Sequence, residues 1–228
     1  MKILPDKRIT EVNRLETFSD AVFAFAATLL VVALEVPDSF QELVAELKGF
    51  IAFALSFTAL ILIWSVHNAI FRRYGVQDRT MIILNGCLLF VVLFYVYPLK
   101  FVSENLVKSF FKLSESGSGI KTLDDLSLLF ELYSAGFVAV FLCISLMYRH
   151  IYKKFGDTFE KSEISSARFH FRHYMIFVLV GILSIILAWS GIGLIFGLPG
   201  FIYSLLGPLC YLHGKSARKK NMMSNPAG

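Results

Sequence analysis

The sequence predicts an all-α membrane protein that crosses the bilayer six times. Of its 228 residues, 56% are hydrophobic and only 17% are charged, a balance that soluble domains of this length seldom have. The mean hydropathy is +0.66, and six apolar runs approach or exceed the roughly 20 residues that a helix needs to span a bilayer. These runs are continuous rather than alternating, which disfavours a transmembrane β-barrel.

The expected spans, in chain order, are residues 18–36, 49–71, 80–101, 126–148, 173–190 and 192–213. The fifth and sixth spans are joined very tightly around Ser190 and Gly191, so we expect them to form a hairpin. Proline lacks a backbone N–H and clashes with the preceding turn, so Pro199 and Pro208 are expected to kink the sixth span.

Two connections are long enough to hold structure of their own. Asp38–Lys48 has apolar residues at helical spacing, which predicts a short amphipathic helix at the outer surface, and residues 103–112 suggest a second one. The polar residues 152–172 are expected to extend the fourth and fifth spans into the cytoplasm. We therefore predict one six-helix domain over residues 1–215 and a disordered cytoplasmic tail over residues 216–228.

The basic residues predict the orientation of the chain in the membrane. Most of the 22 Lys and Arg residues precede the first span, follow the sixth, or lie between spans two and three and between spans four and five. Cytoplasmic connections carry an excess of Lys and Arg, so both termini are predicted to be cytoplasmic. An even number of spans requires the same arrangement.

Asp20 is the most informative single residue, because it opens the first apolar run. A carboxylate within a membrane span costs roughly 2 to 3 kcal/mol even on lenient scales, so it is usually paired or faces water. Arg14, His67 and Asn85 lie at matching depth and, with Ser19, could form a paired polar network around it. Such a network would hold the first helix against the second and third, and a proton-relay or catalytic role for the same groups stays open.

One face of the first span carries residues spaced three and four positions apart. They are Ala21, Phe25, Thr28, Val32 and Glu35, with Leu29 at the border. Such a stripe is first of all a packing seam between helices. In a symmetric oligomer it would instead line a central pore, where Phe25, Leu29 and Val32 form an apolar constriction. Thr28 would add a ring of hydroxyls and Glu35 a ring of carboxylates at the outer mouth, unless Glu35 is only an exposed acid at a helix end.

The remaining candidates for chemistry favour structural roles. The three cysteines lie in apolar segments without a CxxC pair, which is typical of buried thiols rather than of a disulfide or metal site. His170 and His173 stand three residues apart but lack an obvious third ligand, so we interpret them as an interfacial anchor and expect no metal. No motif of nucleotide hydrolysis, voltage sensing or acyl hydrolysis is present, and we expect no catalytic residues.

The first helix and parts of the next two resemble the transmembrane protein 175 family of potassium channels. The pattern Arg14-x-x-x-Phe18-Ser19-Asp20, followed by AVFAFAATLLVV, is similar to the signature first helix of that family. Further matching residues are Trp64, His67, Asp78, Leu84, Asn85 and Pro98, so that the resemblance covers roughly residues 7–101.

The resemblance implies a homotetramer in which helix 1 of each subunit lines a central pore, with a hydrophobic constriction in place of a P-loop filter. Prokaryotic members have one six-helix unit per subunit, which fits a chain of 228 residues. The implied network that supports the pore helix comprises Arg14, Phe18, Ser19, Asp20, Trp64, His67 and Asn85. The narrow point of the family is usually Ile or Leu, and this sequence has Phe25 there.

The sequence is thus interpreted as a potassium-selective, leak-type cation channel of a bacterial plasma membrane. Its expected partners are other copies of itself, membrane lipid and permeant K⁺ ions, with no nucleic acid and no cofactor. The main alternative is a proton-coupled cation transporter that uses Asp20 and His67 as a relay. An intramembrane enzyme with these two groups as acid and base is a third possibility, but it lacks a nucleophile or a metal set.

Overall fold

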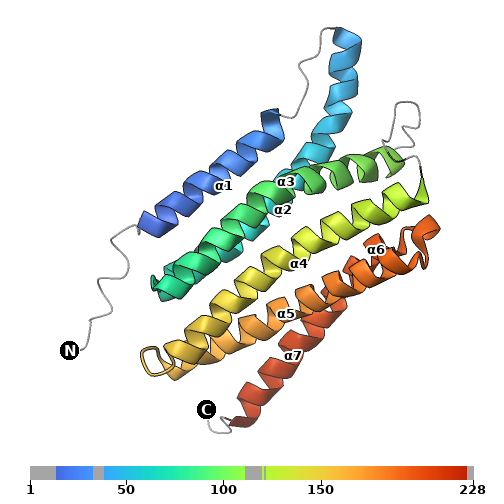
Figure 1. Ribbon diagram of the computed structural model, residues 1–228. Helices are drawn as coiled ribbons and strands as arrows, with labels where there is room; N and C mark the ends of the chain where they lie inside the picture. The colour runs from blue at the N-terminus through green and yellow to red at the C-terminus, as the bar shows by residue number, and fades with distance from the viewer. Residues whose placement is uncertain (1–13, 33–38, 111–119, 121, 225–228) are drawn as a thin grey trace. The chain divides into compact units, whose positions relative to one another are not determined.

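The computed structural model describes residues 14–32, 39–110, 120 and 122–224, and all regular elements in these ranges are helices (Figure 1). The elements are α1 (Arg14–Val32), α2 (Phe40–Tyr74), α3 (Arg79–Phe110), α4 (Leu123–Lys154), α5 (Lys161–Ser190), η2 (Leu194–Phe196), α6 (Leu198–Phe201), η3 (Ile202–Leu205) and α7 (Leu206–Ser224). Five stretches are long and apolar enough to cross a membrane: Arg14–Val32, Gly49–Tyr74, Arg79–Ser109, Leu123–Lys154 and Lys161–Ser190. They correspond to the first five predicted spans.

The helices are longer than the apolar runs that predicted them. The helix expected over Asp38–Lys48 is not separate, because α2 begins at Phe40 and continues without a break to Tyr74. Likewise α3 continues to Phe110, through most of the second predicted surface helix. The expected extension of spans four and five is confirmed, since α4 ends at Lys154 and α5 begins at Lys161.

The sixth predicted span is not one continuous helix. Residues 192–213 pass through η2, α6, η3 and the first part of α7, and none of these is among the five candidate spans. Gly193 and Gly197 adopt left-handed φ values of 69° and 65°, which interrupt the helical path. Pro199 lies in the first turn of α6 and Pro208 in the first turn of α7, so both stand at helix starts rather than inside one long helix.

The last described segment at the C-terminal end is helical. Helix α7 continues to Ser224, although a disordered tail was expected from Ser216. Residues 225–228 lie outside the described part of the chain. The chain packs as two compact units, residues 1–121 and 122–228, and the single domain expected over 1–215 stays a prediction.

Unit 1 consists of α1, α2 and α3, each of which packs against the other two. Leu30 of α1, Leu60 of α2 and Leu88 of α3 are fully buried, so all three helices contribute to one apolar core. Pro98 lies inside α3, and the helix continues on both sides of it.

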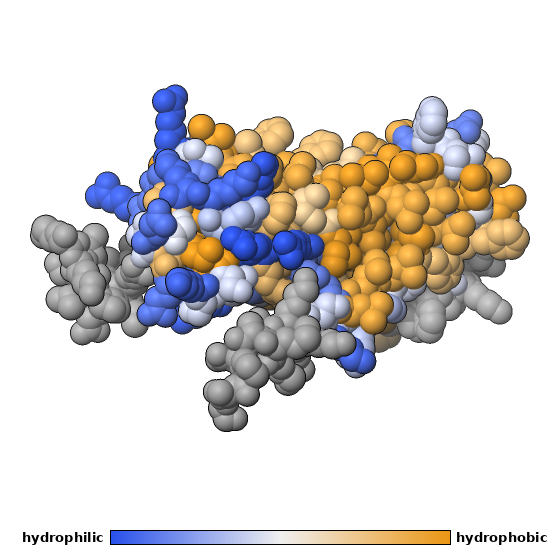
Figure 2. Space-filling model, turned by 90° about the horizontal axis from the view of Figure 1, so that it is seen from below, coloured by the Kyte–Doolittle hydropathy of each residue, from blue (hydrophilic) through white to orange (hydrophobic). Residues whose placement is uncertain are grey.

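Unit 2 is built on a hairpin of α4 and α5, which pack tightly against each other. Gly181 of α5 permits this approach, because a Cβ atom there would lie 2.6 Å from Cγ2 of Val138 on α4. Aromatic rings line the hairpin; for example, the ring centroids of Phe141 and Phe177 are 4.6 Å apart. Hydrophobic residues cover the middle of the face shown in Figure 2, and hydrophilic ones gather where α4 is connected to α5.

Candidate functional site

Helix α1 has one narrow buried face. Ser19, Phe23, Ala26 and Leu30 are buried, and their spacing of four, three and four residues places them on one side of the helix. This side packs against α2 and α3. The contact fixes the rotation of α1 about its own axis and therefore decides which residues it exposes.

A buried chain of hydrogen bonds joins the three helices of unit 1. Nδ2 of Asn85 on α3 donates to Oγ of Ser19 on α1 at 2.9 Å, and Ser19 donates to the Leu15 carbonyl at 2.7 Å. On its other side, Oδ1 of Asn85 lies 2.7 Å from Nε2 of His67 on α2. Ser19, His67 and Asn85 have no exposed surface, so this chain of hydrogen bonds lies in the interior of unit 1.

The hydrogen bond to Asn85 defines the protonation state of His67. A carbonyl oxygen only accepts, so Nε2 of His67 must carry the hydrogen. Among the described residues Nδ1 of His67 is buried without a partner, which suits the lone pair of a neutral imidazole better than a second N–H. The ring also packs between Phe23 of α1 and Phe71 of α2, at centroid distances of 5.4 and 4.7 Å.

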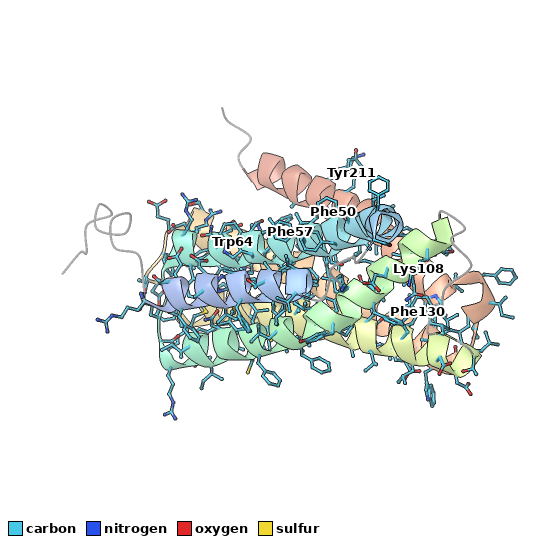
Figure 3. All side chains as sticks on the ribbon, turned by 90° about the horizontal axis from the view of Figure 1, so that it is seen from above. Phe50, Phe57, Trp64, Lys108, Phe130 and Tyr211 are labelled. Carbon is cyan, nitrogen blue, oxygen red and sulfur yellow. The ribbon has the colours of Figure 1, made fainter. Side chains whose placement is uncertain are left out.

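Asp20 makes a separate contact nearer the surface. It is exposed, and its Oδ1 accepts a hydrogen bond of 2.7 Å from Nε1 of Trp64 on α2. Figure 3 shows Trp64 as the last of three labelled aromatic residues that follow one another along α2, after Phe50 and Phe57. The carboxylate therefore ties α1 to α2 without being buried.

The structure thus divides the predicted network. Ser19, His67 and Asn85 meet in one buried chain, and Asp20 meets Trp64 beside it. Arg14 and Phe18 are exposed, and among the described residues Arg14 has no hydrogen-bond or ion-pair partner. Arg14 and Asp20 are both exposed in the single chain, and the expectation of one cluster that buries a charge stays a prediction.

The stripe predicted on α1 lies on the side away from α2 and α3. Phe25 is 57% exposed and Val32 is 72% exposed, and Ala21 and Thr28 are exposed as well. Leu29 is half-buried at the border. The stripe is therefore not a packing seam within unit 1, and Glu35 lies outside the described residues.

Two contacts of the site were not predicted from the sequence. The packing of Phe23 and Phe71 on the His67 ring was missed, although Phe71 stands four residues after His67 and Phe23 four residues after Ser19. That spacing is the signal that could have found them. Within the described part of the chain, no three His, Cys, Asp or Glu side chains are grouped so that they could hold a metal ion.

Known protein families and relatives match the part of the chain that carries these contacts. A family model described as the endosomal/lysosomal potassium channel TMEM175 matches residues 14–95, which include α1 and all residues of the network. A potassium channel of Marivirga tractuosa is 37% identical over 220 residues, which cover 92% of this chain and 89% of that protein. A potassium channel of Chamaesiphon minutus is 33% identical over 106 residues, or 43% of this chain and 52% of that protein.

Solved structures extend the similarity to nearly the whole chain. The crystal structure of a variant of the potassium channel MtTMEM175, in complex with a nanobody fusion protein, has a TM-score of 0.82 and 35% sequence identity. It covers 96% of this chain and 100% of that one. A lysosomal potassium-selective channel TMEM175 homolog from Chamaesiphon minutus has a TM-score of 0.51 at 24% identity, covers 85% and 96% of the two chains, and shares the fold.

Proposed function

The chain belongs to the TMEM175 family of potassium channels, multi-pass membrane proteins that are not enzymes, and from this premise we propose how it conducts ions. Four copies surround a common axis in a bacterial plasma membrane, and their α1 helices enclose a potassium-selective, leak-type pathway. The relatives named above are potassium channels, which supports K⁺ as the permeant ion.

The exposed stripe of α1 is the observation that carries this proposal. Phe25, Thr28 and Val32 lie opposite the buried face of the helix, so a single unit leaves them without a covering helix. Around a fourfold axis, the four copies of this stripe would face one another. The same residues that one subunit leaves exposed would then form successive rings along the ion pathway.

Thr28 is suited to meet a partly dehydrated cation. Its hydroxyl donates to the Ala24 carbonyl at 2.9 Å, so the hydrogen is directed into the helix backbone. The lone pairs of Oγ1 are then left to point away from the helix. A ring of four such oxygens would present acceptors rather than donors to K⁺, and Glu35 remains the carboxylate proposed for the outer mouth.

Phe25, Leu29 and Val32 form the proposed hydrophobic constriction in place of a P-loop filter. Apolar rings of this kind close a pore by excluding water rather than by binding the ion. Opening would rotate or dilate α1 far enough for water to enter between the rings. The buried chain through Ser19, Asn85 and His67 supports this mechanism, because it anchors the start of α1 against two neighbouring helices.

The sixth membrane crossing is also part of the proposal. Helical backbone continues from α6 at Leu198 through η3 to the end of α7 at Ser224, with α and 3₁₀ pieces in direct succession. This path is long enough to cross a bilayer at 1.5 to 2 Å per residue. Together with the five candidate spans it would return the C-terminus to the cytoplasmic side, as the distribution of Lys and Arg predicts.

The contacts of Asp20 favour a channel over the proton-coupled transporter. A relay needs groups that both accept and donate a proton, and the partner of Asp20 is the indole of Trp64, which only donates. Within the described residues, no hydrogen bond joins Asp20 to His67. The two groups of the proposed relay therefore belong to separate contacts.

Bilayer recordings of the purified protein test the proposal. With K⁺ on one side and Na⁺ on the other, a potassium-selective leak channel gives a current without a voltage or ligand stimulus that reverses near the Nernst potential of K⁺. A change in the proton gradient should leave that reversal potential unchanged. A reversal potential that follows the proton gradient with fixed stoichiometry would instead identify a coupled transporter.

A further inference from the structure

The turn between α5 and α6 has an unusual surface that plays no part in the proposed pore. From His173 to Gly214 the sequence contains no Asp, Glu, Lys or Arg, and residues 191–197 form the turn in the middle of this stretch. A turn that enters water between two membrane spans is usually polar. Here the turn and the residues on either side of it, from 173 to 214, contain no Asp, Glu, Lys or Arg.

The side chains of this turn are large, apolar and exposed. Trp189 is 81% exposed, Phe196 80%, Ile195 76% and Ile192 61%. Figure 2 shows hydrophobic surface at the end of unit 2 where α5 gives way to α6. Exposed apolar groups gathered at one place mark a surface that something other than water covers.

The backbone of the turn supplies its own hydrogen-bond acceptors. Gly191 donates to Ala188, Leu194 to Gly191, and Gly197 to Leu194, while the left-handed Gly191, Gly193 and Gly197 allow the chain to fold back so tightly. Further bonds within the turn start from the amides of Phe196, Leu198, Gly200 and Phe201. A backbone that satisfies most of its own N–H groups suits a non-aqueous environment, because lipid offers no partners for them.

Buried polar contacts hold the turn in place from inside. Ser184 of α5 donates to the Pro199 carbonyl at 2.8 Å. Since that proton is used, Ser134 of α4 must donate to Ser184 at 2.8 Å, and Tyr203 in turn donates to Ser134 at 2.8 Å. The polar groups near the turn therefore face inward, and its apolar side chains face outward.

The length of α5 sets the depth of the turn. From Arg172, the last charged residue of the helix, to Ser190 at its end, the rise is about 27 Å. The hydrocarbon core of a bilayer is about 30 Å thick. If Arg172 lies at one interface, the turn reaches the opposite interface without passing beyond it.

We propose that the α5–α6 turn binds the membrane itself, with Trp189, Ile192, Ile195 and Phe196 inserted among lipids at the boundary between headgroups and acyl chains. The inference takes only its membrane orientation from the proposed function. The tip acts as an anchor that fixes the depth of unit 2 in the outer leaflet, since Trp is favoured at this level of a bilayer. Neither water nor a second copy of the chain covers it.

The two tryptophans of the chain make this inference directly testable. The Trp64→Phe protein retains only Trp189, and its fluorescence is measured in phosphatidylcholine vesicles whose acyl chains carry bromine either near the headgroup or near the chain end. We expect the stronger loss of emission with bromine near the headgroup, a derived depth within about 10 Å of the interface, and little quenching by aqueous iodide. The Trp189→Phe protein reports Trp64 alone and serves as the matched control.

Each other result would overturn the inference. Strong quenching by iodide would put the turn in water, and insensitivity to both bromine and iodide would mean that protein covers it. Strongest quenching by bromine at the chain end would put the turn in the bilayer centre. If Trp64→Phe fails to fold, the difference in emission between the native protein and Trp189→Phe gives the same signal. K⁺ flux from vesicles that contain the native protein tests the channel separately, so the two proposals can fail independently.

Discussion

Replacement of Asn85 by alanine should destabilise the protein by removing the link between three helices. Two buried hydrogen bonds are lost, of 2.9 Å to Ser19 and 2.7 Å from His67. Each contributes about 0.5 to 1.5 kcal/mol, with membrane proteins toward the lower end. The N–H of His67 is also left buried without an acceptor, which costs a further ~1 to 3 kcal/mol. We therefore expect Asn85→Ala to lower the free energy of unfolding by about 2 to 5 kcal/mol.

The assay is unfolding of the purified protein by titration with sodium dodecyl sulfate, followed by circular dichroism. Asn105→Ala is the matched control on the same helix, because within the described residues the Asn105 amide donates only to the Phe101 carbonyl of α3 itself, at 2.8 Å. We expect the control to change stability by less than about 0.5 kcal/mol. Equal effects of the two substitutions would refute the claim that the buried chain holds α1 in place.

A double-mutant cycle sharpens this test. Ser19 and Asn85 share one bond, so Ser19→Ala and Asn85→Ala should not be additive, with a coupling of about 0.5 to 3 kcal/mol. Additive losses would mean that the two side chains stabilise the fold separately.

Two further predictions concern other parts of the chain. Phe25→Ala should raise the single-channel K⁺ conductance and reduce the preference for K⁺ over Na⁺, because it removes a bulky apolar ring from the proposed constriction. Phe90 on α3 is 74% exposed and serves as the control, so Phe90→Ala should change neither quantity in the same recordings. Gly181→Ala should lower the unfolding free energy by about 1 to 3 kcal/mol, because the added Cβ would lie 2.6 Å from Val138. The control is Gly207→Ala, which should not lower the unfolding free energy because there is open space around the added Cβ. Equal unfolding free energies of the two variants would refute the tight α4–α5 contact.

The extent of the helices shows where prediction from hydropathy works and where it stops. Apolar runs located the first five candidate spans, because lipid and core both require continuous apolar sequence. They did not give the helix ends. Helix α2 begins at Phe40 rather than near residue 49, since no proline separates the amphipathic segment from the apolar one. Backbone hydrogen bonding continues past the change in hydropathy.

The tight connection expected at Ser190 and Gly191 is confirmed, since α5 ends at Ser190 and Gly191 is left-handed, but the path of the chain after it was not predicted. The apolar composition of residues 192–213 suggested one long span, but Gly193 and Gly197 take left-handed conformations that interrupt it before α6 begins at Leu198. Glycine permits this geometry without requiring it, so the sequence left both outcomes open. The tertiary contacts of Ser184 with Pro199, far apart along the chain, stabilise the outcome that the structure adopts.

The residues of the site were predicted better than the contacts between them. Matching depth in the membrane correctly suggested that Ser19, His67 and Asn85 could meet. Depth does not reveal which way a side chain points around its helix. The partner of Asp20 is therefore Trp64 rather than Arg14, because an indole on the facing helix reaches the carboxylate.

Cross-linking between subunits tests most directly whether copies of α1 meet around one axis. Thr28→Cys is introduced into a protein whose Cys87, Cys143 and Cys210 are replaced by alanine, and membranes are oxidised with copper phenanthroline. If the α1 helices enclose the pathway, Thr28→Cys forms covalent dimers and oxidation reduces the K⁺ current. Monomers and an unchanged current would contradict the account, as would cross-links that appear only when the cysteine is placed on an exposed position of another helix.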